Sequence, residues 1–104
     1  MTQWREIERR ITEPRFDQTI HAALRLQLCA MLAEVDALDF AAAREDLDVS
    51  DSVLSKHVKV LADEGYVEIT SRTSGGRSRK RLALTQAGAR AYAGHVAELR
   101  RLIG

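Results

Sequence analysis

A pair of glycines separates two short runs of alternating residues, and this feature limits the possible folds more than any other. Residues 66–70 alternate as a half-buried strand does, and Leu82 and Leu84 repeat the alternation after the glycines. The two runs predict a β-hairpin with Gly75-Gly76 at its tip. Any fold for this chain therefore has to combine one hairpin with the helical patterns on either side of it.

The hairpin also carries the most uneven charge in the chain. Residues 71–85, SRTSGGRSRKRLALT, contain five basic side chains, and no acidic residue lies between Glu68 and Glu98. The whole chain is nearly neutral, with 16 Lys and Arg residues against 15 Asp and Glu. Residues 33–68 hold ten acids and three bases, whereas residues 69–104 hold eight bases and one acid. A near-neutral net charge therefore conceals a basic face.

Two N-terminal segments have the apolar spacing of amphipathic helices. The first covers residues 2–12 and ends before Pro14, because the residue before a proline avoids α geometry. Its apolar face consists of Trp4, Ile7 and Ile11. The second covers residues 16–35, and its apolar stripe is expected to pack into the core: Ile20, Leu24, Leu28, Met31, Leu32 and Val35.

A helix-turn-helix is predicted over residues 40–64. Its first helix begins after Asp39, which is expected to cap it, and a tight turn follows that helix. Its second helix opens at Ser50 or Asp51 and stops at Gly65, which supplies a left-handed end. The core face of the second helix consists of Leu54, Val58 and Leu61, and its polar face of Ser52, Ser55, Lys56 and Lys59.

The C-terminal segment predicts one more helix, over residues 86–103, with Thr85 as its cap. Its apolar residues repeat at spacings of four, three and four: Tyr92, Val96, Leu99 and Ile103. This narrow seam is suited to packing against another helix.

The elements follow one another as helix, helix, turn, helix, basic hairpin and helix. This order predicts a mainly α fold with a small β-hairpin, the winged helix-turn-helix. With 104 residues and 45% hydrophobic content, the chain is expected to form a single domain over 1–104. The expected parts are an N-terminal helix (1–13), the helix-turn-helix (40–64), the wing (66–84) and a C-terminal helix (86–103).

This architecture predicts a protein that binds double-stranded DNA. The second helix of the helix-turn-helix enters the major groove, and the basic wing lies along phosphates or in the minor groove. Basic side chains on the wing add affinity because they release counterions from the phosphates. The residues expected to contact DNA are Ser50, Ser52, Ser55, Lys56, Lys59, Arg72, Arg77, Ser78, Arg79 and Lys80.

Several stretches also resemble a known family, the small winged-helix transcriptional regulators related to the MarR and ArsR groups. The stretches are LSKHVKVLADEGYV (54–67), the basic hairpin and LTQAG (84–88). FDQTIHAALRL (16–26) resembles the first core helix of short, single-domain members. The resemblance covers residues 16–90 and implies a dimeric regulator with its recognition helix at 51–64 and its wing at 70–84.

The chain departs from the pattern of these regulators at two places. Small or amide residues often stand where this chain has Ser52 and Val53, and a proline often stiffens the wing where it has Ser78. Base specificity and wing rigidity are therefore not carried over from the resemblance.

The terminal segments predict a homodimer. Their apolar residues exceed what a core of this size is expected to cover, so both need a partner. In related regulators the terminal helices pair across a two-fold axis, which places two recognition helices about 34 Å apart on a palindromic site. The alternative is that the terminal helices pack on their own monomer. The expected interface residues are Trp4, Ile7, Ile11, Tyr92, Val96, Leu99 and Ile103.

Two other functions remain open at this stage. A winged helix sometimes serves as a protein-interaction module, and the fold alone does not fix function. Some ArsR-like relatives hold metal with His and acidic residues on the last helix, where this chain has His95 and Glu98 one turn apart, with His21 as a third candidate. No metal site is assigned, because two ligands make a weak one.

His57 is expected to be a structural histidine bonded to the backbone, and Arg25 a surface or ion-pair residue.

No enzyme and no cofactor are expected. The sequence shows no catalytic triad, no paired-carboxylate motif and no phosphate-cradling glycine loop. The lone Cys29 cannot form an internal disulfide and is expected in the core. Without a signal peptide or an apolar run of about 18 residues, the protein is expected to be soluble and cytoplasmic, with no membrane partner. The sequence names no small-molecule effector and no target site.

Overall fold

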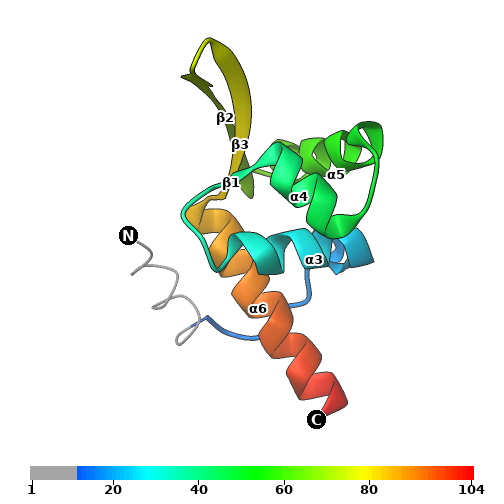
Figure 1. Cartoon of the computed structure of the whole chain (residues 1–104). Helices are drawn as coiled ribbons and strands as arrows, with labels where there is room; N and C mark the ends of the chain where they lie inside the picture. The colour runs from blue at the N-terminus through cyan, green and yellow to red at the C-terminus, as the bar shows by residue number, and fades with distance from the viewer. Residues whose placement is uncertain (1–11) are drawn as a thin grey trace.

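The computed structural model describes residues 12–104. Figure 1 shows a cluster of helices from which a long hairpin, the wing, projects. The elements in chain order are α2 (Gln18–His21), α3 (Ala23–Leu32), β1 (Leu38–Asp39), α4 (Phe40–Leu47), α5 (Asp51–Asp63), β2 (Val67–Ser74), β3 (Arg77–Leu84) and α6 (Gln86–Ile103). The predicted fold class, a mainly helical winged helix-turn-helix, is confirmed. The helix expected from the Trp4, Ile7 and Ile11 spacing lies outside the described residues.

The wing belongs to a three-stranded antiparallel sheet with the order β1-β3-β2. Val67 pairs with Leu84 and Ile69 with Leu82, so the two predicted runs face each other in register. Gly75 and Gly76 have φ angles of 58° and 78°, the positive pair that a two-residue hairpin turn requires. The short strand β1 was not predicted, because two residues leave no alternation to detect.

The core lies where α3, α5, α6 and the base of the wing meet. Its side chains are the apolar stripes of these elements, because each amphipathic element has to bury one face. The largest fully buried apolar side chains are Ile20, Leu28, Leu32, Leu54, Leu61 and Leu82. This arrangement fixes α5 with its polar side outward.

The predicted continuous helix over 16–35 is wrong. The backbone of Ala22 is extended, with ψ at 133°, and it separates α2 from α3. The break frees the carbonyl of Thr19, which a continuous helix would have used, and Arg25 Nε donates to that oxygen at 2.6 Å. The second helix then ends at Leu32, so Val35 lies in the following loop.

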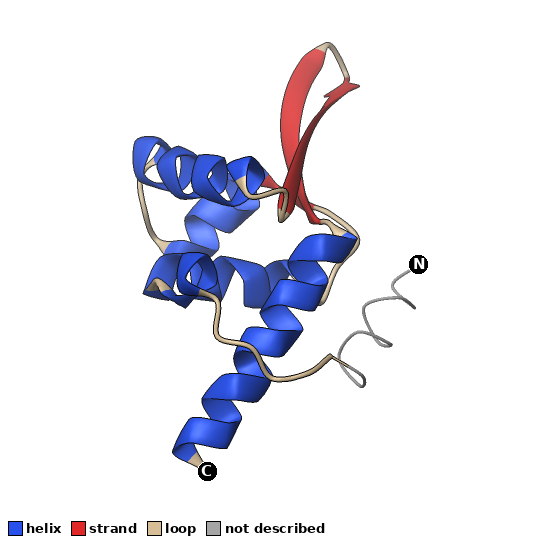
Figure 2. Ribbon diagram, turned by 180° about the vertical axis from the view of Figure 1, so that it is seen from behind, coloured by secondary structure: helices blue, strands red, loops and turns tan. Residues whose placement is uncertain are grey.

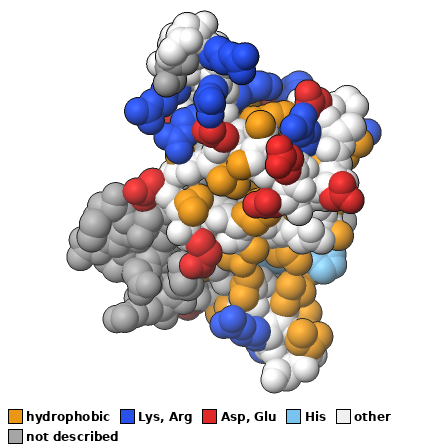
Figure 3. Space-filling model, viewed as in Figure 1, with side chains coloured by type: hydrophobic (Ala, Val, Ile, Leu, Met, Phe, Trp, Pro, Cys, Tyr) orange, Lys and Arg blue, Asp and Glu red, His pale blue; other side chains and the backbone are white. Residues whose placement is uncertain are grey.

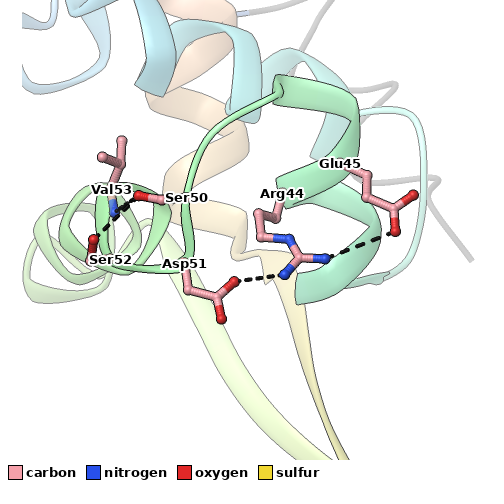
Figure 4. A network of polar contacts seen from close by, with 6 residues as sticks. All are labelled: Arg44, Glu45, Ser50, Asp51, Ser52 and Val53. Atoms are coloured by element: carbon pink, nitrogen blue, oxygen red, sulfur yellow. Dashed lines mark hydrogen bonds and ion pairs between the residues drawn. The ribbon is translucent and has the colours of Figure 1, made fainter.

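The turn between α4 and α5 is set by its polar residues. Asp48 ends α4 in the left-handed conformation, with φ at 55°. The hydroxyl of Ser50 accepts a hydrogen bond from the amide of Val53 at 3.2 Å, which caps α5. Arg44 of α4 bonds Asp51 at 2.9 Å, so the start of α5 is tied to α4 (Figure 4).

The start of α6 is held against the end of α5. The hydroxyl of Thr85 accepts from the amide of Gly88 at 3.0 Å and donates to the carbonyl of Gly65 at 2.6 Å. A Cβ atom at Gly88 would collide with the backbone carbonyl of Tyr66. This contact fixes the wing relative to α5, since β2 and β3 lie between the two helices in the chain. No helix of the described part is long and apolar enough to cross a membrane.

Candidate nucleic-acid interface

The outward face of α5 carries the residues that were expected to contact DNA. Ser52, Ser55, Lys56 and Lys59 are all exposed, whereas Leu54 and its stripe face the core. Helix α5 therefore presents its polar side to solvent in the way that a recognition helix needs.

The polar side chains of α5 differ in whether they already have hydrogen-bond or ion-pair partners. The Ser50 hydroxyl caps the helix and lies 3.2 Å from the Ser52 hydroxyl. Lys59 forms an ion pair with Asp63 at 2.9 Å, one turn further along the same helix. Within the described residues, Ser55 and Lys56 have no side-chain hydrogen bond or ion pair. Lys56 is thus the lysine of this helix that has no acidic partner among the described residues.

The basic residues of the wing lie on two faces of the hairpin. Because side chains alternate along a strand, Arg77 and Arg79 share one face of β3, and Ser78 and Lys80 share the other. Arg72 of β2 is the register partner of Arg79 and lies on the same face. The expected set of wing contacts is therefore divided between an arginine face and a second face.

The second face of the wing contacts α4. The ammonium group of Lys80 lies 4.4 Å from the centre of the Phe40 ring, a cation–π contact. Phe40 is the first residue of α4, so this contact supports the base of the wing on the helix-turn-helix. Lys80 is nevertheless exposed and remains open to an anion.

The expected cap at Asp39 is wrong. The Asp39 side chain makes no capping hydrogen bond to α4. It turns to the wing instead, where one oxygen lies 3.2 Å from Arg81 Nε and the other 3.5 Å from Arg79 Nη1. The Arg81 contact is an ion pair without hydrogen-bond geometry, because Arg81 Nε has no hydrogen-bond partner. The sequence did not show that Asp39 offsets part of the wing charge.

The charge distribution follows from these positions. Figure 3 shows Lys and Arg side chains gathered on the wing, with acidic side chains on the helices below. Arg72 and Arg77 have no acidic partner within the described residues, whereas Arg79 shares Asp39 with Arg81. The arginine face of the wing therefore carries positive charge that the described part of the chain does not neutralise.

Apolar side chains are exposed at the far end of α6. Its buried residues all lie between Gly88 and His95. Beyond them Leu102 is 58% exposed and Ile103 is 83% exposed, and Figure 2 shows this end pointing away from the wing. Three of the expected interface residues, Tyr92, Val96 and Leu99, are half-buried.

The candidate metal ligands have other partners. His95 is fully buried; its Nδ1 accepts from the amide of Asp17 at 3.0 Å, and its Nε2 lies 3.1 Å from His21 Nδ1. Because a backbone amide only donates, the proton of neutral His95 is on Nε2 and points at His21. Both oxygens of Glu98 bond Arg101, at 2.8 and 2.7 Å. Among the residues that the structure describes, no three His, Cys, Asp or Glu side chains form a metal site.

His57 and Arg25 differ from their expected roles. Arg25 Nη1 lies 3.0 Å from His57 Nδ1, so the histidine of α5 bonds a side chain of α3 and not the backbone. Burial lowers the pKa of His57, and the Arg25 charge lowers it further. Together with its bond to Thr19, this contact makes Arg25 a link between α2, α3 and α5.

Cys29 is fully buried in the core. Burial raises the pKa of its thiol to about 12, so the reactive thiolate is scarce at neutral pH. The cysteine therefore serves as a small core residue.

Comparisons with known proteins agree with this geometry. The chain resembles the structure of a transcriptional regulator homologue protein from Pyrococcus horikoshii OT3, with a TM-score of 0.79 and 19% identity over 95% of this chain and 93% of that chain. It also resembles NadR in complex with 4-hydroxyphenylacetate, with a TM-score of 0.69 and 24% identity over 98% of this chain and 66% of that chain. No curated protein matches the sequence. The pattern of the winged helix DNA-binding domain matches residues 24–103, and the chain belongs to that family.

Proposed function

We propose that this chain is a sequence-specific, double-stranded-DNA-binding transcriptional regulator that acts as a homodimer. Helix α5 enters the major groove, and the wing lies on phosphates or in the minor groove. The family and the two regulator structures support this proposal. The observation that carries it is that the wing holds Arg72 and Arg77 without an acidic partner among the described residues, while α5 exposes its polar face to solvent.

The division of the wing suggests how it contacts DNA. Arg72, Arg77 and Arg79 lie on one face and bind phosphate oxygens, because a guanidinium group matches their geometry. Lys80 stays near α4 and adds charge at the base of the wing. The wing therefore supplies affinity that does not depend on base sequence.

Helix α5 supplies the sequence preference in this proposal. Its first turns, with Ser52, Ser55 and Lys56, point outward beside the capped start of the helix. The N-terminal residues of a recognition helix are the ones that reach base edges. Because Lys59 lies beside the opposite charge of Asp63, we expect it to attract phosphate less strongly than Lys56 does.

The homodimer follows from the end of α6. Exposed Leu102 and Ile103 prolong the seam of Tyr92, Val96 and Leu99, and a two-fold partner covers all of them. Such a dimer repeats the recognition helix about one turn of the duplex away and reads a palindromic site.

Selection of duplexes from a random pool tests this function. The expected result is a set of two-fold symmetric sites whose affinity for the protein falls steeply with salt. The Arg72→Ala/Arg77→Ala double variant is expected to have a log-log salt slope that is less steep by about 3.6, because each protomer of the dimer loses two phosphate contacts. Arg100→Ala removes one charge from an exposed residue near the C-terminal end of α6 and serves as the control. A protein-interaction module would show neither selected sites nor salt-sensitive affinity, and that result would overturn the proposal.

A further inference from the structure

Val53 is an exposed apolar residue on the recognition helix. Its side chain is 41% exposed, whereas Leu54, Val58 and Leu61 are 0, 3 and 0% exposed. Each residue of a helix is rotated by about 100° from the one before it, so Val53 points well away from the core stripe. The core therefore does not account for a valine at this position.

The surroundings of Val53 place it at the edge of the polar face of α5. Ser52 precedes it, and exposed Lys56 follows one turn later. Figure 4 shows the Val53 side chain directed away from α4, whereas Asp51 points toward Arg44.

The backbone and the side chain of Val53 are both well fixed. Its amide donates to the capping hydroxyl of Ser50 at 3.2 Å. A valine side chain in a helix takes one preferred rotamer, so its methyl groups have a defined direction and lose little entropy on contact. A group held in this way fits a small apolar target.

The major groove offers one such target. The 5-methyl group of thymine is the apolar group that a base edge presents there, and apolar side chains contact it. The carbonyl, amino and ring-nitrogen groups beside it need hydrogen-bonding partners, which valine does not supply. An exposed valine in the first turns of a recognition helix therefore selects for thymine.

We infer that Val53 reads the 5-methyl group of a thymine in each half-site and is a base-specificity residue of the protein. The inference rests on the proposed DNA-binding function. It predicts that each selected half-site contains a thymine at one fixed position within reach of the start of α5.

Single thymine-to-uracil replacements in the selected duplex test the inference, because they remove only the methyl group. In one half-site, replacement at the contacted position is expected to weaken binding by the wild-type protein about fourfold. In Val53→Ala the same replacement is expected to change the affinity by less than a factor of about 1.5, because the methyl group has lost its partner. Ser55→Ala alters the same helix without touching the valine, and it is expected to keep the fourfold loss. Circular dichroism checks that each variant is folded.

The outcomes separate the inference from the function on which it rests. A selected site without a fixed thymine, or uracil losses that persist unchanged in Val53→Ala, would overturn the inference and leave DNA binding intact. The absence of any selected site would overturn the proposed function and the inference with it.

Discussion

Arg72 and Arg79 lie directly opposite each other on the two strands of the wing. Like charges in directly opposed positions of a sheet are destabilising, and pair effects of this kind amount to roughly 0.2–1 kcal/mol. An anion beside both guanidinium groups relieves that repulsion. The free wing is therefore expected to be less stable than it would be with neutral residues, and in the proposed complex phosphate binding recovers the difference.

Arg72→Ala should accordingly weaken DNA binding without weakening the fold. We expect the melting temperature to stay equal or rise slightly, because the repulsion with Arg79 is removed. We expect affinity to fall about equally on all duplexes and the log-log salt slope to become less steep by about 1.8, because the dimer loses one phosphate contact from each protomer. Thermal unfolding and a salt series of binding measurements check both parts. An unchanged slope would show that this face of the wing does not contact the DNA phosphates.

Asp39→Asn should strengthen DNA binding at low salt. The carboxylate lies within 3.5 Å of Arg79 and 3.2 Å of Arg81, so it competes with phosphate for both cations. Asparagine keeps the shape of the side chain and removes only its charge. The affinity for random duplex is the quantity to measure. Asp63→Asn, which removes the partner of Lys59 on α5, serves as the comparison. Equal or lower affinity for Asp39→Asn would show that the carboxylate mainly orders the wing.

Arg25→Ala should destabilise the fold although the side chain is polar. The variant leaves the Thr19 carbonyl without its donor and removes the contact with His57. A lost partner for a part-buried polar group costs about 1–3 kcal/mol in the free energy of unfolding. Gln27→Ala, at an exposed position of the same helix, should change that free energy by less than about 0.5 kcal/mol. Urea titrations of the two variants should differ clearly, and equal midpoints would contradict the role given to Arg25.

The break at Ala22 explains why part of the fold could not be predicted from the sequence. The apolar spacing from Ile20 to Leu32 is that of one helix, and the local sequence offers no proline or glycine to interrupt it. Contacts from outside the segment hold α2 in place, because Asp17 caps α2 and also accepts from the hydroxyl of Tyr66 at 2.6 Å. Contacts between residues so distant in sequence override local helix propensity.

The candidate interface, like the fold, could be predicted from the sequence only where the signal is a local pattern. The Gly-Gly tip, the basic residues of the wing and the core stripe of α5 are local patterns, and the structure has them in the expected elements. The pairing of Asp39 with the wing depends on β1, which is too short to leave a periodic signal. Val53 was named only as a departure from the family pattern, and its exposure on α5 could not be predicted from the local sequence.

Acid should destabilise the protein through His95. Burial lowers the pKa of this histidine below its usual value, and the neighbouring His21 lowers it further. As the pH falls, the unfolded chain takes up the proton first, at about pH 6.5. The stabilisation is therefore complete above that pH and is lost as the pH falls toward the lower pKa of the folded state.

The pH dependence of unfolding checks this prediction. We expect the urea midpoint of the wild type to fall between pH 7.5 and pH 5.5, flanking the ordinary histidine pKa of about 6.5. His95→Gln should show a smaller fall, because glutamine can accept from Asp17 and donate to His21 without titrating. The remaining fall reflects His57, whose pKa is also lowered by burial. An equal fall in wild type and variant would rule out His95 as the source.

The end of α6 gives the prediction that tests the dimer. Ile103 is 83% exposed, so Ile103→Glu cannot disturb the core of the single chain, whereas it places a charge in the proposed seam. We expect this variant, and Leu99→Glu further along the seam, to be folded monomers at concentrations where the wild type sediments as a dimer. Ala87→Glu introduces the same charge at an exposed position near the other end of the helix and should remain dimeric.

The loss of the dimer should also reduce specific binding. Two tethered recognition helices act on a palindromic site as one bivalent ligand. A tether of this kind raises the affinity by a factor of about 10²–10⁴. The monomeric variants should therefore lose most of their preference for a selected site and keep their weak, salt-sensitive binding to random duplex, because the wing is unchanged. Sedimentation of the wild type as a monomer at high concentration would contradict the dimer. Full-strength binding of a selected site by monomeric Ile103→Glu would contradict the role of the second half-site.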